Sequence, residues 1–201
     1  MKELNGSELA GFIKERQAKA VRGLRQAYNF QPKLAIVVTV EKPVIEIYMR
    51  LKKRYGADIL IDVDIHRVEQ SEALAAIKKL NQDAATHGII VQLPLEDPSQ
   101  TDEIVNAVAP EKDVDALGQE AMFDPATPTA ILWLLAGYGV ELRGRKITIV
   151  GRGKLVGEPL ERMLRASQID ATAYNESDTI EAAVSSSDII ITATGSPGVI
   201  T

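Results

Sequence analysis

Short runs of apolar, β-branched residues alternate with helix-patterned segments along this chain of 201 residues. The run LAIVVTV (residues 34–40) is too short for a typical helix and is continuously apolar, as expected of a strand that is covered on both faces. The same patterns in the rest of the first half predict helices over 8–28, 44–55 and 71–85 and strands over 57–65 and 88–95. Alternation of this kind predicts an α/β fold with a mostly parallel sheet.

A second alternating region follows an irregular stretch. Residues 96–128 contain four prolines, and the helix after them is predicted to begin with Thr127 as its cap and Pro128 at its first position. Beyond it the sequence predicts strands over 146–150, 170–175 and 188–195 and helices over 158–167 and 179–186. We therefore expect two α/β lobes, with the boundary between residues 122 and 123.

The composition excludes several classes of function. With no Cys, the chain has no disulfide scaffold, no thiolate zinc site and no Cys nucleophile. Its two His disfavour a His-rich metal site or a Ser-His-Asp triad as the basis of its function. A net charge of −5 disfavours a general nucleic-acid-binding surface. The N-terminal segment lacks the apolar core of a signal peptide, and no run approaches the length of a membrane span. We expect a cytoplasmic protein that binds no metal, membrane or nucleic acid.

A glycine-rich loop follows the predicted strand 146–150. Gly151, Gly153 and Gly157 are spaced G-x-G-x-x-x-G and lead into a helix, which is the context of a dinucleotide-binding loop with one extra residue. Glycines allow close backbone approach to a ligand, and a helix start offers free N–H groups to a phosphate. A tight turn that binds nothing is the alternative, but the context favours binding and a Rossmann-like second domain.

The identity of the dinucleotide stays open on the residues alone. Arg152 inside the loop and Ser177 after the next strand are candidates to bind the 2′-phosphate of NADP. Glu176 ends that strand, where an acid commonly accepts a hydrogen bond from the ribose 2′-hydroxyl of NAD. NADP is favoured by a small margin, and NAD remains possible.

Three further patterns concern catalysis. Tyr48 and Lys52 lie four residues apart and so share one helix face, where a lysine beside an aromatic ring in an apolar cleft can act as a general base; a solvated helix face is the alternative. Gln92 ends an apolar strand, where ligands collect in α/β sheets, or else faces a sheet edge. Asp115, in the segment KDVD, is a candidate to bind an amino-pyrimidine through two hydrogen bonds, although such acids more often cap turns.

Together these segments resemble the bifunctional methylenetetrahydrofolate dehydrogenase/methenyltetrahydrofolate cyclohydrolase family. The matching segments run in order along nearly the whole chain: LNGSELA, Tyr48-x-x-x-Lys52, GIIVQLPL, PEKDVD, PATPTA, GRGKLVGEP and ATGSPGVI. The resemblance implies two lobes with a folate cleft between them, NADP-dependent oxidation of methylenetetrahydrofolate, hydrolysis of methenyltetrahydrofolate to 10-formyltetrahydrofolate, and a homodimer.

The resemblance also implies roles for individual residues. Lys52 would be the general acid/base, with Gln92 tuning its protonation and Tyr48 packing against the folate. Asp115 would hold the pterin ring, and Leu93 would line the substrate site. The cofactor site would comprise Gly151, Arg152, Gly153, Val156, Gly157, Ser177, Thr194 and Gly195.

The chain departs from the family pattern at four places. Ile45 stands where the family usually has Ser, Gly153 replaces the Ser of the glycine loop, and Ala116 replaces a Gly, which would be strained if the backbone there is left-handed. The chain also ends at Thr201, before the last strands, the Pro-Gly-Gly loop and the closing helix of the family. A non-catalytic folate- or nucleotide-binding relative and a fragment of a longer enzyme are therefore the alternatives to an active enzyme.

Overall fold

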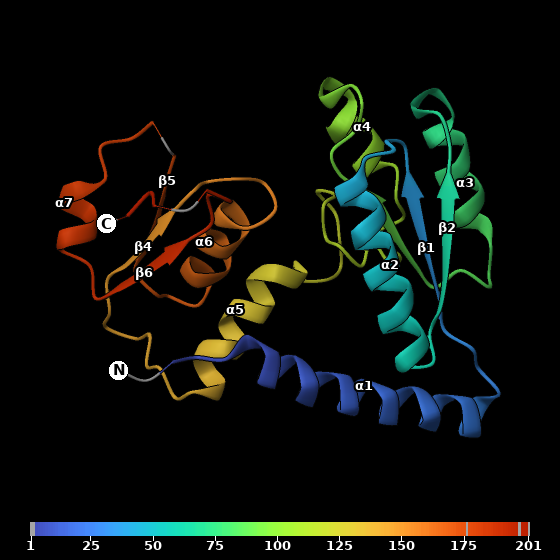
Figure 1. The fold of residues 1–201 in the computed structure, drawn as a ribbon, viewed down its shortest axis with the longest axis horizontal. Coiled ribbons are helices and arrows are strands. Elements are labelled where there is room, and N and C mark those ends of the chain that lie inside the picture. Colours follow the sequence, from blue (N-terminus) through green and yellow to red (C-terminus); the bar gives the residue numbers. More distant parts are fainter. Residues whose placement is uncertain (1–2, 176, 197, 201) are drawn as a thin grey trace. The chain divides into compact units, whose positions relative to one another are not determined.

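The computed structural model describes residues 3–175, 177–196 and 198–200, which form two compact units (Figure 1). The first unit is Gly6–Asp124, and the second comprises the described residues of Met1–Asn5 and Pro125–Thr201. In the part of the chain that the structure describes, no helix is both long enough and apolar enough to cross a membrane.

The first unit is built around a three-stranded parallel sheet in the order β2-β1-β3. Its elements are α1 (Gly6–Tyr28), β1 (Lys33–Val38), α2 (Pro43–Asp58), β2 (Asp62–Arg67), the short η1 (Gln70–Glu72), α3 (Ala73–Gln82), β3 (Gly88–Gln92), η2 (Pro98–Gln100) and α4 (Thr101–Asn106). The central strand β1 pairs with both neighbours, so that Val38 at its carboxyl end lies opposite Gln92 of β3. The loops that follow β1 and β3 therefore meet at one edge of the sheet.

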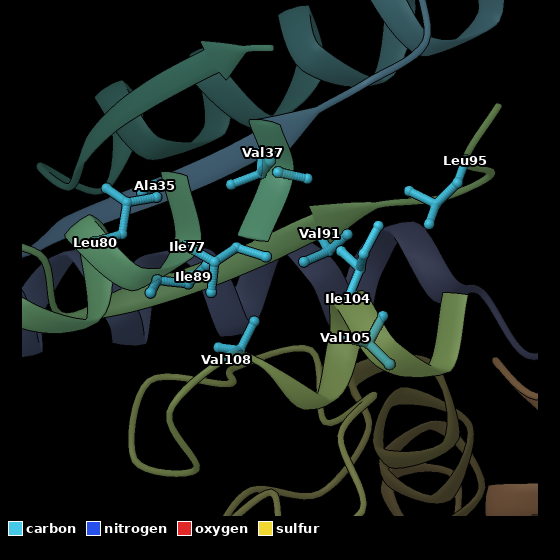
Figure 2. Packing of buried hydrophobic residues seen from close by; sticks show 11 residues of the cluster. Ala35, Val37, Ile77, Leu80, Ile89, Val91, Leu95, Ile104, Val105 and Val108 are labelled. Carbon is cyan, nitrogen blue, oxygen red and sulfur yellow. The ribbon is translucent and has the colours of Figure 1, made fainter. Parts of the chain in front are cut away.

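The packing of the core explains why the sequence of β1 is continuously apolar. Ala35 and Val37 pack on one face against α3 and α4, with Ile77 among the fully buried residues of that cluster (Figure 2). Ile36 and Val38 point to the other face, where α2 covers them. A strand covered on both faces has no polar side, which confirms the α/β prediction.

The second unit repeats this plan with shorter elements: α5 (Ala126–Gly137), β4 (Ile147–Val150), α6 (Gly157–Ala166), β5 (Ala171–Tyr174), α7 (Glu181–Ser185) and β6 (Ile189–Thr192). Its parallel sheet has the order β5-β4-β6. Because β4 is central and its successors lie on either side of it, the strand order reverses at β4, and ligands of such sheets bind beyond the carboxyl ends of the strands at that point.

Two local predictions were wrong. The strand predicted over 57–65 is displaced, because α2 continues to Asp58 and the chain turns through Leu60, with a left-handed φ of 65°, before β2 begins at Asp62. Thr127 does not cap α5, because Pro125 takes the extended conformation before the helix, and Pro128 is its third residue. In both places the backbone conformation of a single residue decides where the element begins.

Candidate active site

Lys52 and Gln92 make the central contact of the first unit. Lys52 lies on α2, and its Nζ donates a hydrogen bond to Gln92 Oε1 at 2.9 Å. Gln92 is the last residue of β3, and its own Nε2 donates to the carbonyl of Leu93 at 2.7 Å. Since that bond fixes which way the amide points, the oxygen of Gln92 is aimed at the lysine.

The surroundings of Lys52 favour its neutral form. Its stem lines an apolar hollow of about 370 Å³ together with Leu34, Leu51 and Ile90, among others. Burial lowers the pKa of Lys52 because it disfavours the charged ammonium, and the negative charge of Asp115 opposes this shift. A lysine that can lose its proton more readily than usual is suited to general acid/base catalysis.

Tyr48 lies one helical turn before Lys52. The residue is 52% exposed, in a stripe with the exposed Val44, Ile47 and Leu51 of α2. Positions four apart share a helix face, so the ring and the Lys52 stem project on the same side of α2. An exposed aromatic ring beside a half-buried lysine is available to stack on a flat ligand.

The segment Lys112-Asp113-Val114-Asp115 lies along β3, where the Ile89 N–H donates to the Lys112 carbonyl at 2.7 Å. Lys112 Nζ donates to the carbonyls of Leu80, Asn81 and Asp83 at 2.8–3.0 Å, and so caps the carboxyl end of α3. A cation at this end of a helix also interacts favourably with the helix dipole. This lysine therefore fixes the segment that presents Asp115.

The two aspartates of this segment differ in role. Asp113 is 3% exposed and accepts the Gly118 N–H at 2.7 Å, so it holds the turn that follows. Asp115 is within electrostatic range of Lys52: burial raises the pKa of its carboxyl, Lys52 lowers it, and Asp113 raises it again. The turn-capping alternative thus applies to Asp113, while the structure brings Asp115 together with Lys52 and Gln92.

Two of the departures from the family pattern have structural consequences in this unit. Ala116 has φ of +54°, so its backbone is left-handed and a side chain there is strained. Ile45 is 2% exposed and packs in the core between α2 and the sheet. It is therefore a packing residue.

The glycine loop of the second unit is shaped by two residues that cannot have a side chain. Gly151 has φ of +103°, and a Cβ there would lie 2.6 Å from the Ala193 carbonyl oxygen. A Cβ on Gly157 would lie 1.8 Å from the Gly151 carbonyl oxygen. By contrast, a Cβ on Gly153 would meet nothing within 4 Å, so the replacement of Ser by Gly leaves open space in the loop.

The other predicted cofactor-site residues lie at the carboxyl ends of the strands of this unit. Val156 precedes α6, and Thr194 and Gly195 form a turn after β6, in which the Thr194 hydroxyl donates to the Ser196 carbonyl at 3.1 Å. Ser177 follows β5 and is exposed, while Glu176, the predicted partner of NAD, lies outside the described residues. The bare backbone around Gly153 and the start of α6 fit a dinucleotide phosphate.

Comparison with known proteins identifies the family. The sequence profile of the tetrahydrofolate dehydrogenase/cyclohydrolase catalytic domain matches residues 4–115, and that of the NAD(P)-binding domain matches residues 125–201. The chain belongs to the tetrahydrofolate dehydrogenase/cyclohydrolase family. The resemblance predicted from the sequence motifs is thereby confirmed.

Individual members of this family match along nearly the whole chain. The bifunctional protein FolD of Moorella thermoacetica is 33% identical over 98% of this chain and 75% of its own length. The structure of the bifunctional FolD enzyme from Campylobacter jejuni matches with a TM-score of 0.89 and 28% identity, over 96% of this chain and 73% of its own. FolD of Trypanosoma brucei, solved with NADP and an inhibitor, matches with a TM-score of 0.90 and 25% identity, over 98% and 72%.

Two charged residues near the candidate sites were not predicted from the sequence to contribute to them. Lys112 is recognised in the sequence as part of a motif, but its three bonds to α3 depend on how the chain folds back. Glu161 is buried on α6 beside Arg152, and only its spacing from Arg165, four residues later, was a signal in the sequence. Among the described residues, no three His, Asp or Glu side chains gather as they would to hold a metal ion.

Proposed function

We propose that this chain oxidises 5,10-methylenetetrahydrofolate to 5,10-methenyltetrahydrofolate with NADP and hydrolyses the product to 10-formyltetrahydrofolate. The family membership supports both reactions, since the FolD relatives are named as bifunctional. The single observation that carries the proposal is the 2.9 Å bond between Lys52 Nζ and Gln92 Oε1 beside Asp115. It supplies a lysine of lowered pKa where a folate substrate needs a proton carrier.

Lys52 serves as the general acid/base in hydrolysis. In its neutral form it accepts a proton from the water that attacks the methenyl carbon, and the resulting ammonium donates a proton to the folate nitrogen as the carbon–nitrogen bond breaks. Gln92 orients Nζ through its carbonyl oxygen, which the bond from its amide to Leu93 keeps in place. The balance between burial and the charge of Asp115 keeps the lysine able to take and return a proton.

Substrate binding falls to residues around this pair. Tyr48 stacks on the folate, for which its exposed ring on the Lys52 side of α2 is suited. Asp115 holds the pterin ring by accepting hydrogen bonds from its amino-pyrimidine edge, and Leu93 lines the same site. Burial raises the pKa of Asp115, but the positive charge of Lys52 lowers it and so favours the charged carboxylate that accepts such hydrogen bonds.

The second unit holds the dinucleotide. The backbone of Gly151, Gly153 and Gly157 and the start of α6 bind its phosphates, with Val156, Thr194 and Gly195 around them and Arg152 and Ser177 toward the 2′-phosphate. When bound, NADP supplies the acceptor for the hydride that leaves the substrate carbon. The protein's own contribution to that step is orientation.

The wider organisation follows the family. Residues 1–122 form the folate-binding catalytic domain, and residues 123–201 form the NAD(P)-binding domain. The protein works as a homodimer in the cytoplasm. The location is supported by the human relative named C-1-tetrahydrofolate synthase, cytoplasmic, which is 34% identical over 96% of this chain and 23% of its own length.

Replacing Lys52 tests the proposal. Lys52→Met should lower the hydrolysis of methenyltetrahydrofolate, followed by its absorbance, by at least about a hundredfold, the contribution of a positioned general base. Lys53→Met is the matched control, because it changes the exposed neighbouring lysine of the same helix and should leave the rate within about twofold. Hydrolysis by Lys52→Met at the wild-type rate would contradict the role of Lys52. A folded wild-type protein that turns over neither folate would contradict the function.

A further inference from the structure

Glu161 is a buried carboxylate for which the proposed reaction has no use. It lies on the inward face of α6 between the core residues Leu160 and Leu164, and its side chain is only 7% exposed. A buried charge is costly unless it is paired and hydrogen-bonded. The partners of Glu161 therefore indicate what it does.

One carboxylate oxygen of Glu161 secures the edge of the sheet. Its Oε1 accepts the Ala173 N–H of the edge strand β5 at 3.1 Å and lies 2.9 Å from Arg165 Nη2. Arg165 in turn donates from Nε to the Ala171 carbonyl of the same strand at 2.9 Å. The pair thus occupies backbone groups that an edge strand otherwise leaves open.

The other oxygen reaches the glycine loop. Glu161 Oε2 lies 3.4 Å from Nη2 of Arg152, whose side chain is 49% exposed. Two guanidinium groups therefore share one carboxylate, and the charge that Arg152 can offer to an incoming anion is partly cancelled. A negative charge on the inner side of Arg152 weakens the electrostatic attraction between this arginine and a phosphate.

We propose that Glu161 sets the dinucleotide preference of this protein: it holds Arg152 and offsets its charge, so that the 2′-phosphate of NADP is favoured only weakly over the free 2′-hydroxyl of NAD. This inference rests on the proposed function, because it concerns the same dinucleotide site. It makes Glu161 a specificity-determining residue that acts through Arg152 and does not touch the dinucleotide.

The test compares 2′,5′-ADP with 5′-AMP, which differ only in the 2′-phosphate, by calorimetric titration of the full chain. In Glu161→Gln the amide oxygen still accepts from Ala173 N and Arg165, while the negative charge is lost. We expect the preference for 2′,5′-ADP, as a ratio of Kd values, to rise about fivefold, since a like charge near the phosphate is removed. A gain of affinity confined to one ligand is not a result that loss of structure can produce.

Two further variants sharpen the test. Asp170→Asn removes the same charge from the exposed residue before β5, at the amino-terminal end of the strands, whereas the glycine loop lies at their carboxyl end. It should leave the ratio unchanged. Arg152→Ala should lower the ratio, and adding Glu161→Gln to Arg152→Ala should produce no further change, because Glu161 acts through Arg152. A gain that persists without Arg152 would overturn this mechanism.

The remaining outcomes are also decisive. A ratio that is unchanged or lower in Glu161→Gln would overturn the proposal, the latter by showing that Glu161 orients Arg152 for the phosphate. If Glu161→Gln does not fold, Arg152→Ala alone decides. If the charge of Arg152 is offset, removing its guanidinium should lower the preference for 2′,5′-ADP only about threefold, and a decrease above about thirtyfold would contradict the offset. A folded wild-type protein that binds neither probe would instead overturn the dinucleotide site of the proposed function.

Discussion

The two units use opposite means to build a binding site at the carboxyl ends of a parallel sheet. In the first unit the candidate site consists of side chains from α2, from the end of β3 and from the segment that follows α4, and charged groups hold them in place. In the second unit the candidate site is largely bare backbone, shaped by the absence of side chains at Gly151 and Gly157. The first site should therefore respond mainly to changes of charge, and the phosphate-binding loop of the second mainly to changes of volume.

This difference follows from the ligands that the two sites are suited to bind. A folate presents a flat ring with an amino-pyrimidine edge, which needs an aromatic surface and a carboxylate. A dinucleotide presents phosphates, which backbone N–H groups at a helix start can bind directly. Similar α/β frameworks thus bind one ligand with side chains and the phosphates of the other with backbone.

The largest expected effect is steric and belongs to the second unit. Gly157→Ala places a Cβ where it would lie 1.8 Å from the Gly151 carbonyl oxygen, so either the loop or α6 must move. We expect the free energy of unfolding of this unit to fall by about 3 kcal/mol or more. Trp133 on α5 is the only tryptophan of the chain, so its fluorescence during denaturant unfolding reports on the second unit.

Gly153→Ala is the matched control for this prediction. Its Cβ would meet nothing within 4 Å, so the free energy of unfolding should stay within about 0.5 kcal/mol of the wild-type value. Equal losses in the two variants would show that the loop tolerates no side chain anywhere, and the steric account of Gly157 would then be wrong.

The glycine loop and the α/β alternation with parallel strands could be predicted from the sequence, because both depend on local patterns. A strand followed by spaced glycines and a helix has few alternative folds, and β1 had to be covered on both faces because it has no polar side. The position of β2 could not be predicted, since it depends on the left-handed conformation of Leu60.

The candidate catalytic residue required more than its own neighbourhood. Considered alone, Lys52 resembles Lys53 on the same helix, and it is burial and the bond to Gln92 that distinguish Lys52 in the structure. The sheet residues Leu34 and Ile90 beside Lys52, and its partner Gln92, are distant in the sequence, so the resemblance to a family was needed to select Lys52. Glu161 was missed for the same reason, because two of its three partners, Arg152 and Ala173, lie outside α6.

A smaller effect is electrostatic and belongs to the first unit. Gln92→Glu places a carboxylate of the same shape where the amide oxygen lies 2.9 Å from Lys52 Nζ. The new charge stabilises the ammonium and raises the pKa of Lys52, so less of the neutral base is present near neutral pH. We expect hydrolysis of methenyltetrahydrofolate at pH 7 to fall about tenfold, a free-energy difference of about 1.4 kcal/mol.

The pH profile separates this cause from damage to the site. Activity that depends on neutral Lys52 rises with pH through its pKa, so in Gln92→Glu the rising limb should move to higher pH and the rate should recover there. Gln82→Glu adds the same charge at the exposed end of α3 and should leave the profile in place. A uniform loss at every pH in Gln92→Glu would count against a role for Gln92 in the protonation of Lys52.

The smallest expected effect comes from Ala116, a residue of the first unit whose backbone conformation disfavours a side chain. Ala116 adopts φ of +54° directly after Asp115, where a side chain is strained. Ala116→Gly should raise the free energy of unfolding of the first unit by about 0.5–1 kcal/mol, the relief of strain less the greater flexibility of glycine when unfolded. Far-UV circular dichroism during denaturant unfolding measures this gain, while the Trp133 transition of the second unit should not move. A loss of stability would mean that the methyl group of Ala116 makes contacts worth more than its strain, and that this turn is held by packing as well as by the Asp113 carboxylate.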